Sequence, residues 1–259
     1  MDIPFDVSGL LPAAQPVAHA VAEVYWEHTR PWFVGLLCFG SVAKGSIIPG
    51  ASDIDFHLYL EDAAFSSDGT LPLELYLRIH QDVAQIDPAP LRYIDGGIEP
   101  VAPLEEGHVG PIPGAYQLIA GKLPIPEATA QDLREQAYWS LSRLIPMPPL
   151  LTEGLLQYGQ SRGQLALTVR TFSQSVWPVL FQVLCLKQHD PLAVWRLSKE
   201  QAVELLAQDN VMGQHTTAFY AAIRAYYPAE SSLEQALAII RHGVVFLETA
   251  RAWARQQCV

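Results

Sequence analysis

The stretch FGSVAKGSIIPGASDIDFHLYL, residues 39 to 60, decides how the rest of the chain is interpreted. An apolar run ends at Gly40 and Ser41, a loop of turn-forming residues follows, and Asp53 and Asp55 then stand in a segment with the composition of a strand. Because side chains alternate along a strand with a period of two, the two carboxylates share one face. Like charges at this spacing repel each other unless a cation lies between them. The stretch therefore predicts a cation site.

Gly40 and Ser41 extend this prediction to a phosphate. A glycine lets a phosphate approach the backbone closely, and backbone N–H groups and a hydroxyl can donate to it. Mg²⁺ suits Asp53 and Asp55, because this hard cation takes one or two carboxylates together with substrate phosphates. One or two Mg²⁺ ions held there would form a nucleotidyl-transfer site, in which the metals bind the attacking and leaving oxygens.

Composition excludes several classes of protein. Half of the 259 residues are apolar and 17% are charged, which indicates a globular chain with a sizeable core. A formal charge of −11 argues against a nucleic-acid partner, since phosphate backbones are bound by clustered Lys and Arg. The beginning of the chain has no basic segment and no apolar run is long enough to span a membrane, so we expect no membrane partner and a cytoplasmic protein. The three cysteines lie far apart and predict reduced thiols, with neither a disulfide framework nor a zinc site; they are Cys38, Cys185 and Cys258.

The hydrophobic pattern changes near residue 126 and predicts two domains, 1–126 and 127–259. In the first, an α/β half, the expected helices are 17–28 and 72–85, the expected strands are 32–39, 53–61 and 90–95, and 100–126 is expected to be a covering loop. The second is expected to be a bundle with helical segments 127–145, 152–188 with breaks, 198–208, 214–227 and 231–256. Capping boxes mark two helix starts, Ser198 with Gln201 and Ser231 with Glu234.

The order Gly-Ser, loop, Asp-x-Asp resembles the signature of the nucleotidyltransferase superfamily, which includes DNA polymerase beta and kanamycin nucleotidyltransferase. An α/β half followed by a helical half is most similar to the streptomycin and spectinomycin adenylyltransferases. Two further segments resemble that family, GAYQLIAGKLPIPE (114–127) and VWRLSKEQAVELL (194–206). The resemblance implies an α+β fold: a nucleotidyltransferase domain with a small mixed sheet, followed by a C-terminal helical bundle.

Nucleotide transfer to a hydroxyl calls for a base or a third metal ligand. The superfamily takes this carboxylate from a later strand beside the Asp-x-Asp strand, and Asp95 is the matching position, with Glu99 as the alternative. The similar adenylyltransferases carry a Glu at this strand, in a different local context. If neither Asp95 nor Glu99 serves, the third carboxylate is expected in the helical half, at Glu127 or Glu153. His57 shares the face of the two aspartates in a regular strand, but we interpret it as structural.

Lys199 is predicted to bind nucleotide. If Ser198 caps a helix, Lys199 stands in its first turn, where the helix dipole disfavours a cation. A bound anion would offset the unfavourable interaction between the Lys199 ammonium and the helix dipole, because free N–H groups and the ammonium would both contact it. The similar family segment carries a lysine that contacts the triphosphate, while the alternative is a solvated surface lysine. Arg162 and Arg170 are possible partners.

The sequence thus leads to two hypotheses. The first is an enzyme that uses Mg²⁺ to move AMP from ATP onto a hydroxyl of a small molecule in a cleft between the halves, with an aminoglycoside as a cationic acceptor suited to an acidic protein. The alternative is a nucleotide-binding or protein-modifying, antitoxin-like module with a protein partner. The acceptor, the nucleotide base and the oligomeric state stay open.

Overall fold

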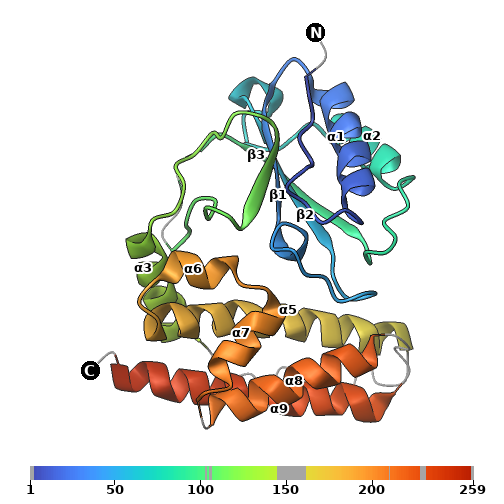
Figure 1. The fold of residues 1–259 in the computed structure, drawn as a ribbon. Helices are drawn as coiled ribbons and strands as arrows, with labels where there is room; N and C mark the ends of the chain where they lie inside the picture. Colours follow the sequence, from blue (N-terminus) through green and yellow to red (C-terminus); the bar gives the residue numbers. More distant parts are fainter. Residues whose placement is uncertain are drawn as a thin grey trace. The chain divides into compact units, whose positions relative to one another are not determined.

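The computed structural model describes residues 3–102, 104, 107–144, 162–209, 211–227 and 232–257. The chain divides into two compact units, Met1–Ala128 and Thr129–Val259 (Figure 1). The sequence places the boundary two residues earlier, after 126. The roles expected of the two halves stay predictions.

A small mixed sheet forms the centre of the first unit. Its strands are β1 (Phe33–Phe39), β2 (Ile54–Leu60), β3 (Ile94–Pro100) and β4 (Tyr116–Gly121), in the order β3-β2-β1-β4. β1 pairs antiparallel with both β2 and β4, whereas β2 and β3 run parallel. The predicted α+β fold with a small mixed sheet is confirmed.

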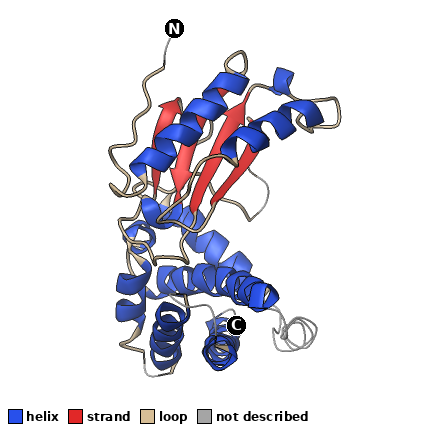
Figure 2. Ribbon diagram, turned by 90° about the vertical axis from the view of Figure 1, so that its right-hand side faces the viewer, coloured by secondary structure: helices blue, strands red, loops and turns tan. Residues whose placement is uncertain are grey.

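Two helices, α1 (Gln15–Thr29) and α2 (Leu73–Val83), lie side by side over one face of this sheet (Figure 2). Alternate residues of β1 and β2 point toward them and are fully buried, as the period of two requires; they are Leu36, Cys38, Phe56 and Leu58. α1 presents small residues to this core, among them Ala18 and Ala22, so that helix and sheet can approach closely. Two short 3₁₀ helices, η1 (Gly40–Val42) and η2 (Asp62–Ala64), follow β1 and β2. The face with Asp55 and His57 is the opposite one.

The third strand was predicted at 90–95, and the bounds of this prediction are wrong. Gly96 and Gly97 were interpreted as the break after the strand, yet β3 begins at Ile94 and runs through both glycines to Pro100. The reason lies in packing: a Cβ at residue 96 would come within 2.5 Å of the Tyr25 hydroxyl on α1. Gly96 therefore permits a close approach inside the strand. As a result Asp95 lies near the beginning of β3 and does not close it.

The prediction of a covering loop over 100–126 is also wrong in part, because the segment contains β4. Tyr116–Gly121 pairs with β1 in the register Phe39 with Tyr116 and Leu37 with Leu118. The short run YQLIAG lies among proline and glycine residues, which are typical of loops, so the sequence does not indicate a strand. It becomes a strand because it pairs with β1.

The second unit is helical, as predicted. Its described helices are α3 (Ala130–Ser142), α5 (Arg162–Lys187), α6 (Pro191–Arg196), α7 (Lys199–Leu206), α8 (Met212–Tyr226) and α9 (Leu233–Gln257). α6 was not predicted, since its six residues are too few to show a helical period. None of the helices in the described parts of the chain combines the length and apolar character needed to cross a bilayer.

The capping box at Ser198 and Gln201 is confirmed, with the Ser198 hydroxyl accepting from the Gln201 N–H at 3.1 Å. A second capping box joins Thr129 and Asp132 at the start of α3 and was not predicted, because the acid at its third position is Asp instead of Glu or Gln. The box predicted at Ser231 lies outside the described residues.

Candidate active site

Three strand ends meet at one edge of the sheet in the first unit. β1 ends where β2 and β3 begin, because β1 runs antiparallel to β2 and β2 runs parallel to β3. In register, Phe39 pairs with Asp55, and Asp55 pairs with Asp95. Partners in register project to the same face of a sheet. The two carboxylates therefore occupy neighbouring positions on the face opposite α1 and α2.

Gly40 lies directly against the Asp55 carboxylate. Its φ of +81° is in the left-handed region that glycine adopts at little cost. A Cβ at this position would lie 2.8 Å from Oδ2 of Asp55. Both observations require glycine, and they place the backbone after β1 beside one of the predicted metal ligands.

Ser41 presents a buried hydroxyl that has no hydrogen-bond partner in the part of the chain that the structure describes. Its carbonyl accepts from the Ser46 N–H at 3.0 Å, and the Gly40 carbonyl accepts from the Lys44 N–H at 3.2 Å, so the loop curls back on itself. Buried polar groups normally have a partner. A hydroxyl without a partner, next to a glycine whose backbone has no side chain to shield it, is suited to donate a hydrogen bond to a phosphate oxygen.

Asp53 precedes β2 and contacts a residue that the sequence analysis missed. The hydroxyl of Tyr93, just before β3, donates a hydrogen bond to Oδ2 of Asp53. No local motif predicts this contact, because the two residues are 40 positions apart and meet only when β2 and β3 pair.

Two neighbours respond to the negative charge of these acids. Burial raises the pKa of the Cys38 thiol, and the charge of Asp55 raises that pKa further. Burial raises the pKa of Tyr25 to about 12, with a smaller contribution from the charge of Asp95. The thiols of Cys38 and Cys185 are buried and are not in a disulfide, whereas Cys258 lies outside the described residues.

Glu99 lies farther along β3 than Asp95, in register with Tyr59. Its Oε2 is 4.0 Å from Nδ1 of His57, whose ring also packs edge-on against Phe39 with centroids 5.0 Å apart. Glu127, the other described alternative, accepts a hydrogen bond from the Tyr116 hydroxyl at 2.8 Å. Asp95 is thus the alternative that stands in register with Asp55, and Glu153 lies outside the described residues.

The donor set fits a magnesium ion in its chemistry. Carboxylate oxygens are the ligands Mg²⁺ prefers, and it commonly binds through one or two of them plus substrate phosphates. Among the described residues, no three His, Cys, Asp or Glu side chains lie close enough together to hold a metal by themselves. Asp53 and Asp55 are the residues that would hold such an ion, and Asp95 pairs in register with Asp55.

Lys199 belongs to the second unit, where it stands in the first turn of α7 as predicted. Its Nζ lies 5.1 Å from the centroid of the Trp177 ring. Arg170 lies on α5, and the Arg162 side chain lies outside the described residues. The predicted role of Lys199 in nucleotide binding stays a prediction.

Comparison of the whole chain with solved structures finds a crystal structure of spectinomycin adenyltransferase AAD(9) from Enterococcus faecialis with ATP and spectinomycin. The match has a TM-score of 0.55 at 15% sequence identity and covers 92% of this chain and 98% of that one. The chain shares its overall fold with this structure. No protein-family model matches the chain, and no curated protein matches it either.

Proposed function

We propose that the chain is a magnesium-dependent nucleotidyltransferase that moves AMP from ATP onto a hydroxyl of a small molecule. The observation that supports this most strongly is the contact between Gly40 and Asp55, which joins the predicted phosphate and metal positions at one edge of an adenyltransferase fold. The unpaired hydroxyl of Ser41 adds a donor beside it.

Each residue has a role in this proposal. Asp53 and Asp55 would hold Mg²⁺, which neutralises charge on the triphosphate and orients it when bound. The Gly40 backbone and the Ser41 hydroxyl would bind phosphate oxygens, as would Lys199. As the acceptor oxygen bonds to the α-phosphorus of ATP, the bond from that phosphorus to pyrophosphate breaks. Asp95 would take the proton of the acceptor hydroxyl.

An aminoglycoside or aminocyclitol is the first acceptor class to test. The chain carries a formal charge of −11, which favours cationic ligands through long-range attraction. The similar enzyme was crystallised with spectinomycin, a compound of this chemistry.

The experiment incubates the full chain with ATP, Mg²⁺ and a panel of aminoglycosides and aminocyclitols. Pyrophosphate release and an acceptor mass increased by one AMP are the readouts. A protein-acceptor arm with labelled ATP tests for modification of a protein instead. Asp53→Asn and Asp55→Asn should abolish transfer and keep the fold, whereas Asp62→Asn, which changes an exposed acid on η2, should not reduce it. Unchanged turnover in either of the first two variants would refute the proposal.

A further inference from the structure

The contact between Tyr93 and Asp53 follows from how β2 and β3 pair. Ile54 and Ile94 are partners in register, and the two residues just before them are Asp53 and Tyr93. The Ile54 N–H donates to the Tyr93 carbonyl at 3.2 Å, which fixes the tyrosine backbone beside the beginning of β2. The phenol hydroxyl then donates to Oδ2 of Asp53.

The segment that carries Tyr93 is bound to the loop that carries Asp53. The Arg92 N–H donates to the Ser52 carbonyl at 2.9 Å, and Nη1 of Arg92 donates to the Gly50 carbonyl at 3.0 Å. Ser52 itself is buried, and its hydroxyl accepts from the Ile48 N–H at 2.9 Å. Tyr93 and Asp53 are therefore held in place by bonds on both sides of their own contact.

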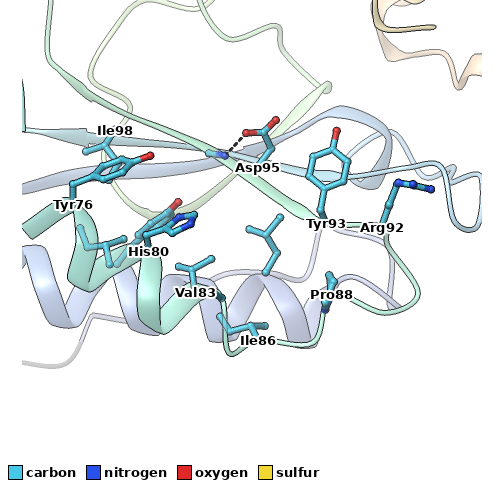
Figure 3. Close-up of a pocket in the computed structure, with 14 residues that line it drawn as sticks. Tyr76, His80, Val83, Ile86, Pro88, Arg92, Tyr93, Asp95 and Ile98 are labelled. Atoms are coloured by element: carbon cyan, nitrogen blue, oxygen red, sulfur yellow. Dashed lines mark hydrogen bonds between the residues drawn. The ribbon is translucent and has the colours of Figure 1, made fainter. Parts of the chain in front are cut away.

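The side chain of Tyr93 also has a defined direction. Tyr93 lies at one end of a cavity of about 340 Å³ along β3, which α2 lines with Tyr76 and His80. Tyr93 and Asp95 extend to one side of the strand, whereas Val83 and Ile86 lie on the other (Figure 3). The phenol thus belongs to the face that carries the acids and not to the face that packs on the helices.

We propose that Tyr93 is a positioning residue for the metal site. Its hydroxyl donates to Oδ2 of Asp53 and fixes the orientation in which this carboxylate would meet a divalent cation. The inference rests on the proposed function, because it assigns Asp53 to the metal. Partners that orient a metal-binding carboxylate commonly change metal affinity by 10- to 100-fold when they are removed.

The test measures Mn²⁺ binding to the full chain by electron paramagnetic resonance, with and without a non-hydrolysable ATP analogue. Tyr93→Phe should weaken Mn²⁺ binding about tenfold, the lower end of that range, since one hydrogen bond is lost and the ring is kept. Tyr76→Phe is the matched control: it removes the same oxygen from the lining of the same cavity and should bind Mn²⁺ as the wild type does. Asp53→Asn should lose the binding.

The outcomes separate this inference from the function on which it rests. If Asp53→Asn loses Mn²⁺ and Tyr93→Phe binds it as tightly as the wild type or more tightly, the role of Tyr93 is overturned and the metal site stands. If Asp53→Asn binds Mn²⁺ normally, the proposed metal site itself fails.

A second measurement covers the case in which Tyr93→Phe is unstable. Mn²⁺ should raise the urea midpoint of the wild type, because a ligand that binds only the folded state stabilises it by mass action. The rise should be smaller for Tyr93→Phe at the same Mn²⁺ concentration. An equal or larger rise would overturn the proposal even in a destabilised variant.

Discussion

Asp55 and Asp95 are partners in the parallel pairing of β2 and β3, so their carboxylates start from adjacent positions on one face of the sheet. Asp53 directly precedes the same strand. Glu99, by contrast, pairs with Tyr59 and stands closer to His57 than to the beginning of β2. This difference in position separates two candidates that the sequence alone leaves side by side.

We predict that Asp95→Asn lowers turnover by about 10² to 10⁴-fold, the effect of removing a positioned acid or base, and changes ATP binding little. Glu99→Gln is the matched control on the same strand and should be milder. Steady-state kinetics together with ATP titration measures both effects. A larger loss in Glu99→Gln would move the role to Glu99, and normal turnover in both variants would place the third carboxylate elsewhere.

A substitution at Gly40 is expected to have two separate effects, a loss of stability from backbone strain and a loss of activity from contact with Asp55. Gly40→Ala should destabilise the fold by about 1–2 kcal/mol because an L-residue is disfavoured at positive φ. It should also abolish transfer, since the new methyl would displace the Asp55 carboxylate.

Gly69→Ala is the control for this change, because Gly69 has a φ of +78° with nothing within 4 Å of the added Cβ. Urea unfolding should show a similar loss of stability in both variants, and only Gly40→Ala should lose activity. Full activity in Gly40→Ala would show that the close approach to Asp55 does not matter for transfer.

The placement of the candidate site residues between 39 and 60 could be predicted because it is local; their roles stay predictions. Gly40 ends a strand and Asp55 stands in the next, and a strand, a short loop and a second strand bring such residues together whatever the rest of the chain does. The alternation of side chains predicts that Asp53 and Asp55 share one face, and the structure begins β2 one residue after Asp53.

The rest depends on contacts between distant segments. From the sequence, Gly96 is typical of a strand end. In the structure it lies inside β3, where a Cβ would collide with the Tyr25 hydroxyl. β4 gains its structure from pairing with β1, and Tyr93 gains its role from pairing of Ile54 with Ile94. Contacts between segments so far apart in the chain leave no periodic pattern of residues within either segment.

Lys199 is tested by ATP affinity and its dependence on salt. Lys199→Ala should weaken ATP binding and make it less sensitive to salt, because a screened charge contact is lost. Lys187→Ala is the matched control: Nζ of Lys187 also lies over a tryptophan, 5.0 Å from the ring centroid of Trp253, and pairs with Asp209 at 2.8 Å. It should leave ATP binding unchanged.

The contact of Lys199 with Trp177 offers an alternative role for this lysine, namely packing within the helical unit. A cation–π contact of this kind is worth about 0.5–1 kcal/mol at an exposed site. If Lys199→Ala loses stability of that order and binds ATP with wild-type affinity and salt dependence, its role lies in packing on Trp177.

The final prediction concerns pH and a histidine pair in the helical unit. His215 on α8 and His242 on α9 face each other with their Nδ1 atoms 3.4 Å apart. Burial lowers the pKa of His242 below its ordinary value of 6.5, and the nearby charges of His215 and Arg241 lower that pKa further. The unfolded chain therefore binds more protons than the folded chain as the pH falls through this range.

It follows that this histidine contributes stability above pH 6.5, and that the contribution is lost as the pH falls through the lowered pKa of the folded state. Urea midpoints of the wild type should decrease on acidification below pH 6.5, and His242→Gln should show a smaller decrease. His19→Gln, which changes an exposed histidine of α1 beside Glu23, is the control and should keep the wild-type dependence. An undiminished decrease in His242→Gln would show that the acid sensitivity arises from other groups.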